Sequence, residues 1–555
     1  MANTVDLSEL ASERWDAIVI GTGMGGATAG HALAQAGWRV LFLERGASHL
    51  GAADTALTGR YAEQFFAQSV APQPEHRDLL RKAGRYADLI DDHSHSSPRS
   101  FVPFVGTGTG GSTALYGMAL ERFFPADFEP RRYHPGARET TLPEAWPIAY
   151  ADLVPYYEAA ERLYRVRGAV DPFRSGERRD HFMAPPALTP LGNEMFTHLA
   201  ARGMHPYRLP MACEFVAGCE CCQGYLCPKS CKNDATRICL EPALATMGAK
   251  LVDDCEVVRL EATRQEVTGV VCTWQGREVV LRSNIVILAA GALETPRLLL
   301  DSASAEWPQG LANESGLVGR NLMRHHIDLL VLPPKSKGLL DNRHKELAFN
   351  DFYQSAEGKF GSVQSFGRLP PAETLVAAMQ DDLRQEVGNW AAQVFKLAKP
   401  FMKPFLGRMV GRSIVLATTL EDLPYADNRV EQSQGRARLA IRYRVRSHDR
   451  SRIEAFRRLV LAALKPYRPM LIKQAENNQR IAHVCGTCRF GDDPVTSVLD
   501  ANNRAHGLDN LFVLDASFFP SSGGINPSLT IAANALRVAD HLTFGSSHKP
   551  REINE

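Results

Sequence analysis

One stretch near the N-terminus constrains the fold more than any other part of the chain. It reads WDAIVIGTGMGGATAGHALAQAGWRVLFLERG and runs from Trp15 to Gly46. Its first apolar run is typical of a buried parallel strand, and the alanine-rich segment that follows predicts a helix ending at Gly37. The run WRVLFLE predicts a second strand. A strand–helix–strand unit of this kind indicates an α/β fold.

Three glycines join the first strand to the helix in the spacing G-x-G-x-x-G. Gly21 permits the tight turn, Gly23 lets the backbone approach a pyrophosphate, and Gly26 lets helix and strand pack closely. Glu44 ends the second strand about twenty residues later, where a carboxylate accepts hydrogen bonds from ribose hydroxyls. Together these features predict a dinucleotide site, with NAD and FAD both open at this point.

The C-terminal region favours FAD. The segment NLFVLDASFFPSSGGINPSLTIAANALRVADHL contains an apolar strand ending at Asp515, a Gly/Ser loop, and a helix with Pro527 in its first turn. A dinucleotide site that is completed by a distant strand, loop and helix suits FAD, which is long and buried, better than NAD.

Length and composition set the class of protein. The 555 residues are 45% hydrophobic and 23% charged, which predicts a soluble chain of two or three domains. The net charge of +1 gives no general attraction to nucleic acid or anionic lipid. We find no secretory signal and no apolar run near the roughly 18 residues of a membrane span. We therefore expect a cytoplasmic protein.

Further segments resemble, in order, the motifs of the glucose–methanol–choline (GMC) flavoenzyme family. They are GTGTGGSTALYGMALERF, WPIAYADLVPYYEAAE, VILAAGALETPRLLLDS, GLVGRNLMRHH, HVCGTCRFG and GGINPSLT. The resemblance implies an α/β protein with a Rossmann-like FAD-binding domain and a discontinuous substrate domain on a mostly antiparallel sheet. The expected FAD domain is 1–60, 100–135, 205–330 and 480–545, the substrate domain 136–204 and 331–479, and the polar tail 546–555.

The same resemblance assigns the catalytic pair. His483 matches the family's base, and Asn526 matches its partner, which can orient a hydroxyl but cannot exchange protons. We interpret the adjacent His325 and His326 as structural, because neighbouring residues face different ways on a regular element. The residues implied to contact FAD are Gly21, Gly23, Gly26, Glu44, Gly110, Gly111, Ser112, Met118, Val257, Asp515, Ala516 and Pro527.

Six cysteines lie close together between Cys213 and Cys231. Four of them form a C-C-x4-C-x3-C pattern that can ligate an iron–sulfur cluster. The pattern resembles a GMC subgroup of sugar dehydrogenases that carry a three-iron (3Fe-4S) cluster. Zinc and structural thiols remain open alternatives, and Cys213 and Cys219 leave the ligand set ambiguous. The predicted ligands are Cys221, Cys222, Cys227 and Cys231.

The expected substrate domain carries a basic, aromatic stretch at 389–412. It is either a lid with a solvated basic face or a peripheral contact with the inner membrane, which would suit electron delivery to a quinone. Four apolar segments are expected to form one mostly antiparallel sheet over the flavin. They are ELAFNDFYQ, KFGSVQSFG, SIVLATTLED and ARLAIRYRV.

These observations predict an FAD-dependent oxidoreductase that converts an alcohol or sugar CH–OH group to a carbonyl. A hydride goes to flavin N5, His483 accepts the hydroxyl proton, and electrons pass to an acceptor protein or quinone rather than to oxygen. The alternatives are a GMC-type oxidase that uses dioxygen and a non-redox lyase on the same fold. A non-catalytic electron-transfer subunit is disfavoured because His483 and Asn526 are both present.

Overall fold

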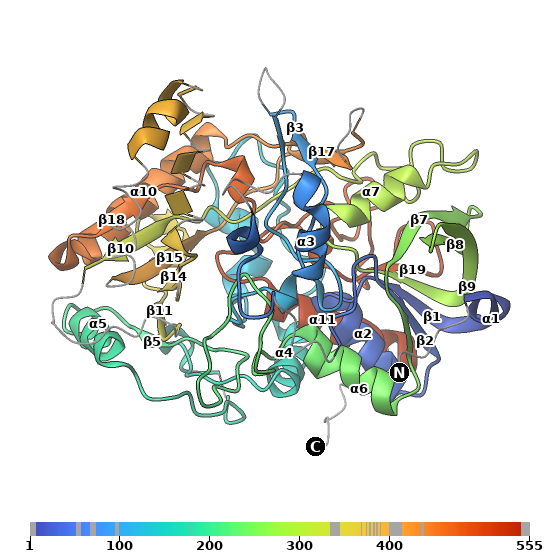
Figure 1. The fold of residues 1–555 in the computed structure, drawn as a ribbon, viewed down its shortest axis with the longest axis horizontal. Helices are drawn as coiled ribbons and strands as arrows, with labels where there is room; N and C mark the ends of the chain where they lie inside the picture. The colour runs from blue at the N-terminus through green and yellow to red at the C-terminus, as the bar shows by residue number, and fades with distance from the viewer. Residues whose placement is uncertain are drawn as a thin grey trace.

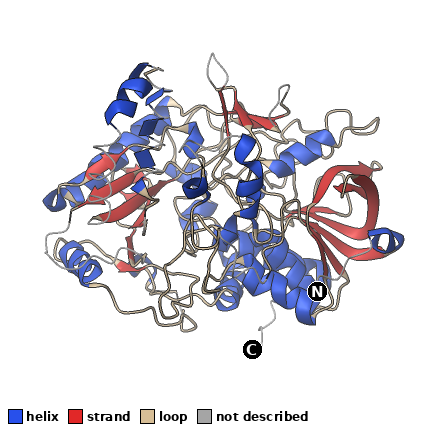
Figure 2. Cartoon of the chain, in the orientation of Figure 1, coloured by secondary structure: helices blue, strands red, loops and turns tan. Residues whose placement is uncertain are grey.

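The computed structural model describes residues 7–545, apart from 51–56, 67–73, 95–98, 178, 334–344, 368, 399–412, 434–437 and several positions between 373 and 389. Two large sheets lie at opposite ends of the molecule, the seven-stranded one on the right of Figure 1 and the six-stranded one on the left. Loops, helices and a small sheet at the top of the view lie between the two large sheets (Figure 2).

The seven-stranded sheet contains the predicted dinucleotide-binding unit. β1 (Arg14–Ile20) pairs in parallel with β2 (Val40–Leu43) and with the C-terminal part of β9 (Arg277–Leu288). The N-terminal part of β9 pairs in antiparallel fashion with β8 (Val267–Trp274). The remaining strands are β6 (Lys250–Val252), β7 (Cys255–Ala262) and β19 (Leu511–Val513), so the sheet joins three distant parts of the chain.

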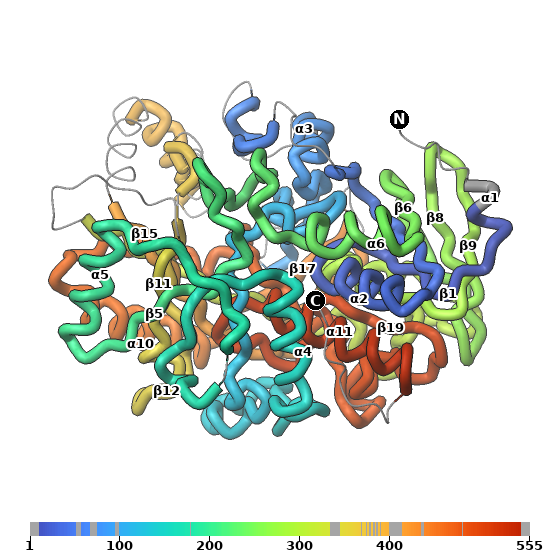
Figure 3. Tube along the Cα trace, turned by 90° about the horizontal axis from the view of Figure 1, so that it is seen from below, coloured from blue at the N-terminus to red at the C-terminus, as the bar shows by residue number. Residues whose placement is uncertain are grey.

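Helices cover the parallel part of this sheet. α2 (Met24–Gln35) follows β1, ends just before Gly37 as predicted, and packs against α11 (Ser528–Phe544), which also contacts α4 (Tyr150–Leu163) (Figure 3). A β-carbon on Gly30 would stand 2.3 Å from the Phe42 ring, so helix and sheet approach as closely as glycine allows.

The six-stranded sheet is antiparallel throughout. Its order is β18 (Met470–Ile472), β10 (Leu329–Leu332), β15 (Ile414–Leu420), β14 (Gly361–Ser365), β11 (Leu347–Phe349) and β5 (Tyr207–Arg208). One face packs on α10 (Ser447–Ala463) through a buried aromatic and aliphatic core that includes Phe360 stacked on Phe456.

One predicted strand belongs to a different sheet. Three of the four segments expected over the flavin are β11, β14 and β15, but the fourth, β17 (Leu439–Arg442), pairs with β16 (Arg429–Glu431) and with β3 (Ile90–Asp92). β4 (Arg99–Phe101) completes this four-stranded sheet. The prediction was wrong because β17 is recruited by a strand almost 350 residues earlier in sequence, a contact that no local pattern reveals.

The remaining elements are short. They are α1 (Leu7–Ser12), α3 (Arg77–Lys82), α5 (Pro190–Ala200), α6 (Glu241–Thr246), α7 (Glu294–Asp301), and the hairpin strands β12 (Gln354–Ser355) and β13 (Gly358–Lys359). Among the described helices, none combines the length and the apolar character needed to span a membrane. The mixed α/β class expected from the sequence is confirmed.

Candidate active site

A long cavity follows the carboxyl-terminal edge of the parallel strands, from the end of β2 past the glycine loop to His483. Strand ends of this kind are where open α/β sheets bind ligands. Ten of the sequence-predicted site residues line the cavity. They are Gly21, Gly23, Glu44, Gly111, Ser112, Val257, His483, Asp515, Ala516 and Pro527. The other predicted residues, Gly26, Gly110, Met118 and Asn526, are not among the lining residues.

The three glycines of the first loop serve three different steric needs. Gly21 has φ +98°, and a β-carbon there would stand 2.4 Å from the Ala289 carbonyl oxygen. A β-carbon on Gly26 would stand 2.1 Å from the Gly21 oxygen, whereas one on Gly23 meets no protein atom within 4 Å. Gly23 is the N-cap of α2 and offers no side-chain cap, so the first-turn amides remain available to a phosphate.

Glu44 organises the loops around one end of the cavity. Its Oε2 accepts from the Thr22 amide and hydroxyl at 3.1 and 2.6 Å, and its Oε1 accepts from the amides of Gly46 and Gly108 at 3.0 and 3.1 Å. Burial raises the pKa of this carboxyl, and the hydrogen bonds oppose that shift. The carboxylate thus accepts four hydrogen bonds from the protein. Glu44 therefore holds these loops together, a role that the sequence did not predict in addition to the contact with a ribose.

Asp515 joins two loops in the same way at the middle of the cavity. Its Oδ2 accepts from the Gly291 amide at 2.9 Å and the Thr295 hydroxyl at 2.5 Å, while its Oδ1 accepts from the Ser517 amide at 2.8 Å. The loop after β9 and the loop after β19 therefore meet at one carboxylate. The sequence placed Asp515 near a diphosphate but gave no sign of this cross-link.

His483 and His325 contact each other at the far end of the cavity. Their Nδ1 atoms lie 2.8 Å apart, and His325 Nε2 lies 2.9 Å from the Gly523 carbonyl oxygen. Backbone pairing of Met323 with Cys485 in antiparallel register sets the two histidines opposite one another. The interpretation of His325 as a structural histidine is therefore wrong: it touches the candidate base.

The hydrogen-bond network assigns the protons of this pair. A carbonyl oxygen only accepts, so His325 Nε2 carries a proton, and in a neutral imidazole its Nδ1 is then an acceptor. His483 must donate from Nδ1, which leaves its Nε2 with a free lone pair. Burial lowers the pKa of His325 to about 4, and burial, with His325 and Lys345 nearby, holds the pKa of His483 well below its usual value. Both rings are neutral at neutral pH.

Asn526 directly precedes α11, and its side chain is buried. Its Oδ1 has no hydrogen-bond partner among the described residues, although the side chain is only 8% exposed. A buried carbonyl oxygen without a partner is costly unless something binds to it. Pro527 is the N-cap of α11 and lines the cavity with Ser528, so the positive end of the helix dipole lies at the cavity wall.

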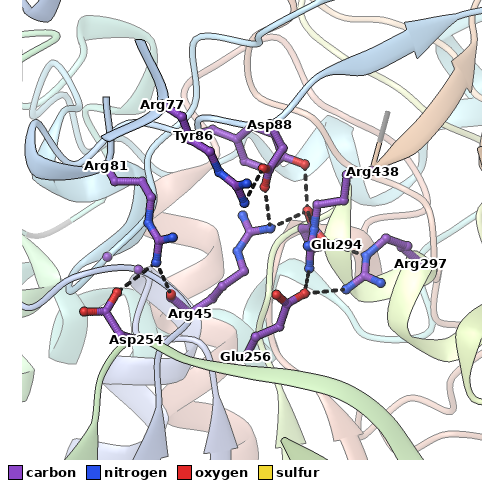
Figure 4. Close-up of polar contacts among 12 residues, drawn as sticks. Arg45, Arg77, Arg81, Tyr86, Asp88, Asp254, Glu256, Glu294, Arg297 and Arg438 are labelled. Carbon is purple, nitrogen blue, oxygen red and sulfur yellow. Dashed lines mark hydrogen bonds and ion pairs between the residues drawn. The ribbon is translucent and has the colours of Figure 1, made fainter. Parts of the chain in front are cut away.

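A network of arginines and carboxylates closes the opposite end of the cavity (Figure 4). Glu294 is its hub: it accepts from Arg45 at 3.0 Å, Arg438 at 2.7 Å, Arg297 at 2.6 Å and the Tyr86 hydroxyl at 2.7 Å. These arginines and burial act in opposite senses, and the arginines hold the pKa of Glu294 far below its usual value.

The network connects parts of the chain that share no local sequence. Arg45 also pairs with Asp88, Arg438 also pairs with Glu256, and Arg81 pairs with Asp254 at 2.8 Å. The ion pairs therefore tie the end of β2, the region of α3, the start of β7, α7 and the approach to β17 around the same end of the cavity. None of these residues was predicted from the sequence, because arginine, aspartate and glutamate are ordinary surface residues until the fold brings them together.

We predict that Glu294→Gln destabilises the protein by about 3 kcal/mol at neutral pH, because it leaves the buried Arg297 and the largely buried Arg45 and Arg438 without their shared carboxylate. The native pKa of Glu294 is depressed, so its contribution is complete above the pKa of an unfolded glutamate and is lost as the pH falls toward the native pKa. Urea unfolding of wild type and variant should therefore differ at neutral pH and converge in acid.

The control for this prediction is Glu278→Gln, which removes an exposed carboxylate paired with Arg259 at 2.9 Å. Exposed pairs contribute little to stability, so this variant should unfold like the wild type. Equal stability of Glu294→Gln and the wild type at neutral pH would show that the network is dispensable.

The cysteine loop forms a thiol cluster different from the predicted quartet. The Sγ atoms of Cys213, Cys219 and Cys221 lie within 4.8 Å of one another, and Cys231 adjoins them at 3.2 Å from the Cys219 Sγ. Cys227 lies at the edge, 3.5 Å from the Cys231 Sγ. Of the four predicted ligands, Cys221 belongs to this group of three and Cys231 contacts it, and the chain folds back at Cys213 and adds an earlier thiol.

Comparisons with known proteins agree with this geometry. Models of the GMC oxidoreductase family match residues 210–327 and 424–535, and an FAD binding domain model matches 16–78. The chain is 30% identical over 568 residues to 6'''-hydroxyparomomycin C oxidase of Streptomyces lividus, covering 96% of this chain and 92% of the relative. It is 24% identical over 570 residues to the fructose dehydrogenase large subunit of Gluconobacter japonicus, covering 95% and 97%.

A solved structure shows the same fold. The crystal structure of pyridoxine 4-oxidase from Mesorbium loti superposes with a TM-score of 0.59 at 19% identity, covering 97% of this chain and all of the other. The matching family models and the 30% identical relative define a flavin-dependent oxidoreductase. The chain belongs to the GMC oxidoreductase family and binds FAD, as the resemblance implied.

Proposed function

We propose that the enzyme oxidises a CH–OH group of a small alcohol or sugar to a carbonyl, with His483 as the proton acceptor. The observation that supports this most directly is the neutral His483, whose Nδ1 is held by His325 at 2.8 Å and whose Nε2 is left free to accept a proton. Bound FAD supplies the hydride acceptor. The chain supplies the base and its orientation, which is the protein's share of this chemistry.

Three other features support the same assignment. Asn526 presents an unpaired amide oxygen, which can accept a hydrogen bond from the substrate hydroxyl and position it. The N-terminus of α11 places partial positive charge at the cavity wall, where it stabilises negative charge. His483 itself has φ +55°, a left-handed conformation that is uncommon for a residue with a side chain and typical of functional sites.

The names of the relatives support an alcohol or sugar as the substrate. They differ in the electron acceptor that they imply. Paromamine 6'-oxidase of Streptomyces fradiae is named an oxidase, whereas 2-methyl-1,2-propanediol dehydrogenase of Mycolicibacterium austroafricanum is named a dehydrogenase. We propose an acceptor other than oxygen, with a GMC-type oxidase and a non-redox lyase as the alternatives. Anaerobic mixing of the holoenzyme with alcohols and sugars tests the oxidation through bleaching of the flavin, and reoxidation by air or by a quinone then separates the acceptors.

We also propose that the thiol cluster binds metal, with a revised ligand set. One tetrahedral ion with metal–sulfur bonds of about 2.3 Å would hold its thiolates roughly 3.8 Å apart. The Cys213 and Cys219 Sγ atoms are 3.7 Å apart, which fits one ion better than a three-iron cluster, whose irons spread their ligands more widely.

Metal analysis of protein purified without air tests this proposal. We expect Cys221→Ser to lose the metal and to keep both FAD and its reduction by substrate, because the thiol is outside the lining of the cavity. Cys272→Ser, which changes a buried thiol on β8, is the control and should keep the metal. Iron with acid-labile sulfide indicates a cluster, and zinc or iron alone indicates a single ion. Protein that contains FAD but no metal would show that the cysteines are structural thiols.

A peripheral membrane contact was predicted for residues 389–412. Residues 399–412 lie outside the described residues, so the argument uses residues 390–398. Residues 390–398 are helical and expose Trp390, Val394 and Leu397, whose spacing places them on one side of the helix. We propose that this side contacts a membrane surface or an acceptor protein. Sedimentation with anionic vesicles, compared between the wild type and Trp390→Ser, tests it.

A further inference from the structure

The carbonyl group that fixes the protons of the histidine pair belongs to a peptide unit with a second buried partner. His325 Nε2 lies 2.9 Å from the Gly523 oxygen and 3.2 Å from the Ser522 oxygen. The N–H of the same peptide unit, which is that of Gly524, donates to the Tyr353 hydroxyl oxygen at 2.8 Å. Both polar groups of this peptide are therefore occupied, one by the histidine and the other by the tyrosine.

Tyr353 is held in turn by a buried carboxylate. It follows β11, is only 1% exposed, and donates its hydroxyl proton to Asp127 Oδ2 at 2.7 Å. The Phe124 amide donates to the same oxygen at 2.7 Å, and Lys359 Nζ lies 2.7 Å from Asp127 Oδ1. Burial raises the pKa of Asp127, and Lys359 opposes that shift. With donors at both oxygens, the carboxyl group is ionised at neutral pH and can only accept.

These contacts form a chain in which each group sets the role of the next. Because Asp127 only accepts, Tyr353 spends its hydroxyl proton there, and its oxygen is left to accept from the Gly524 N–H. In a trans peptide the N–H and the C=O point in opposite directions, so the carbonyl oxygen faces His325. His325 Nε2 must then donate, and its Nδ1 accepts from His483. The chain therefore ends at a free lone pair on His483 Nε2.

The opposite orientation of the peptide would disable the base. The N–H would then face His325, whose Nε2 would have to accept and whose proton would move to Nδ1. His483 would carry its own proton on Nε2, with no lone pair there for a substrate hydroxyl. The peptide joins two glycines, and Gly523 has φ +62°, so the backbone itself restricts this unit less than most. A hold on the peptide from outside the loop therefore has a chemical consequence.

We propose that Tyr353 and Asp127 are positioning residues for the base: they fix the peptide between Gly523 and Gly524, and this peptide, through His325, keeps His483 Nε2 unprotonated. This inference rests on the proposed function, because it concerns the base of the same site. Hydrogen bonds in such a chain polarise one another, so the charge of Asp127 also strengthens each bond along it.

Tyr353→Phe removes the hydroxyl and breaks the chain at its second member. The matched control is Tyr207→Phe: Tyr207 is 2% exposed, donates to the Glu121 carboxylate, and accepts from Asn350 Nδ2 at 2.9 Å. We expect both variants to bind FAD and to lose similar thermal stability. Only Tyr353→Phe should lower the limiting rate of anaerobic flavin bleaching by an alcohol, about tenfold, the weight of one hydrogen bond, with an unchanged half-saturating concentration.

Two further measurements separate positioning from a structural role. Nitrogen NMR of the holoenzyme with ¹⁵N-labelled histidine reports which nitrogen of each ring is protonated, and His325→Ala and His483→Ala assign the signals. We expect His325 to be protonated on Nε2 and His483 on Nδ1 in the wild type and in Tyr207→Phe, and a mixture with the reverse form in Tyr353→Phe. In a His325→Ala background, Tyr353→Phe should slow bleaching no further.

The outcomes distinguish this inference from the proposed function. The reverse protonation in the wild type overturns the positioning role, and this measurement applies even where Tyr353→Phe does not fold. A Tyr353→Phe enzyme with the wild-type rate and protonation, or one that is slowed equally with and without His325, also overturns it. A wild type with the expected protonation whose flavin no alcohol or sugar reduces instead overturns the proposed function.

Discussion

Replacement of His483 with alanine is expected to leave FAD bound and to slow reduction of the flavin by an alcohol about 10²–10⁴-fold, the usual weight of a general base. The reason is that His483 Nε2 is the free acceptor of a histidine pair whose protons are fixed by the Gly523 carbonyl oxygen. Anaerobic stopped-flow spectroscopy measures the rate of flavin bleaching directly, without any contribution from the electron acceptor.

The pH profile belongs to the same prediction. The native pKa of His483 is depressed, so the ring is neutral and able to accept a proton throughout the neutral range, and the bleaching rate of the wild type should fall only well below pH 6.5. His205→Ala removes an exposed histidine bound to Asp351 and should bleach at the wild-type rate. A His483→Ala enzyme that also bleaches at that rate would remove this residue from the mechanism.

The pairing of His325 with His483 shows why part of the site was not predictable. The two residues are 158 positions apart and meet only because the Met323 and Cys485 backbones pair in antiparallel register. The segment that contains His325 carries no alternation or helical period that would reveal this partner. A two-residue shift in that register would have put Met323 or Ile327 near the base instead.

The dinucleotide-binding unit was predictable because its determinants are local. The glycine spacing, the apolar strand and the alanine-rich helix are all encoded within about thirty residues, as such motifs are. A β-carbon on Gly21 or Gly26 would collide with backbone, and one on Gly23 would meet open space, which leaves the predicted approach of a pyrophosphate to Gly23 sterically possible. By contrast, the ion pairs around Glu294 join five separate segments, and each residue becomes informative only after folding.

The cysteine loop lies between these two extremes. Its sequence predicts a thiol cluster, since five cysteines fall within thirteen residues. The sequence does not predict which thiols come into contact, because these contacts depend on a turn at Cys221, with φ +46°, and on the backbone bridge between Cys213 and Lys232. Composition therefore predicted the kind of site, and backbone geometry selected its members.

Gly23→Val should fold and yet fail to retain FAD, the largest effect expected of any change in the binding loop. Gly23 has φ −68°, which any residue can adopt, and a β-carbon there meets no protein atom within 4 Å. The β-carbon of the valine would therefore face whatever approaches the first turn of α2. In a dinucleotide-binding loop that is the pyrophosphate. The loss of a favourable N-cap residue costs the fold only about 1 kcal/mol.

Two further glycines make the experiment decisive. Gly25→Ala would place a β-carbon 1.5 Å from the Leu514 carbonyl oxygen and should damage the fold itself, whereas Gly176→Val fills open space on the exposed surface and should bind FAD normally. Circular dichroism reports folding, and the ratio of flavin to protein absorbance reports FAD content. We expect only Gly23→Val to combine a native spectrum with nearly no flavin. A folded Gly23→Val protein with full FAD content would show that the cofactor's phosphates lie elsewhere, since a β-carbon at residue 23 meets no protein atom within 4 Å.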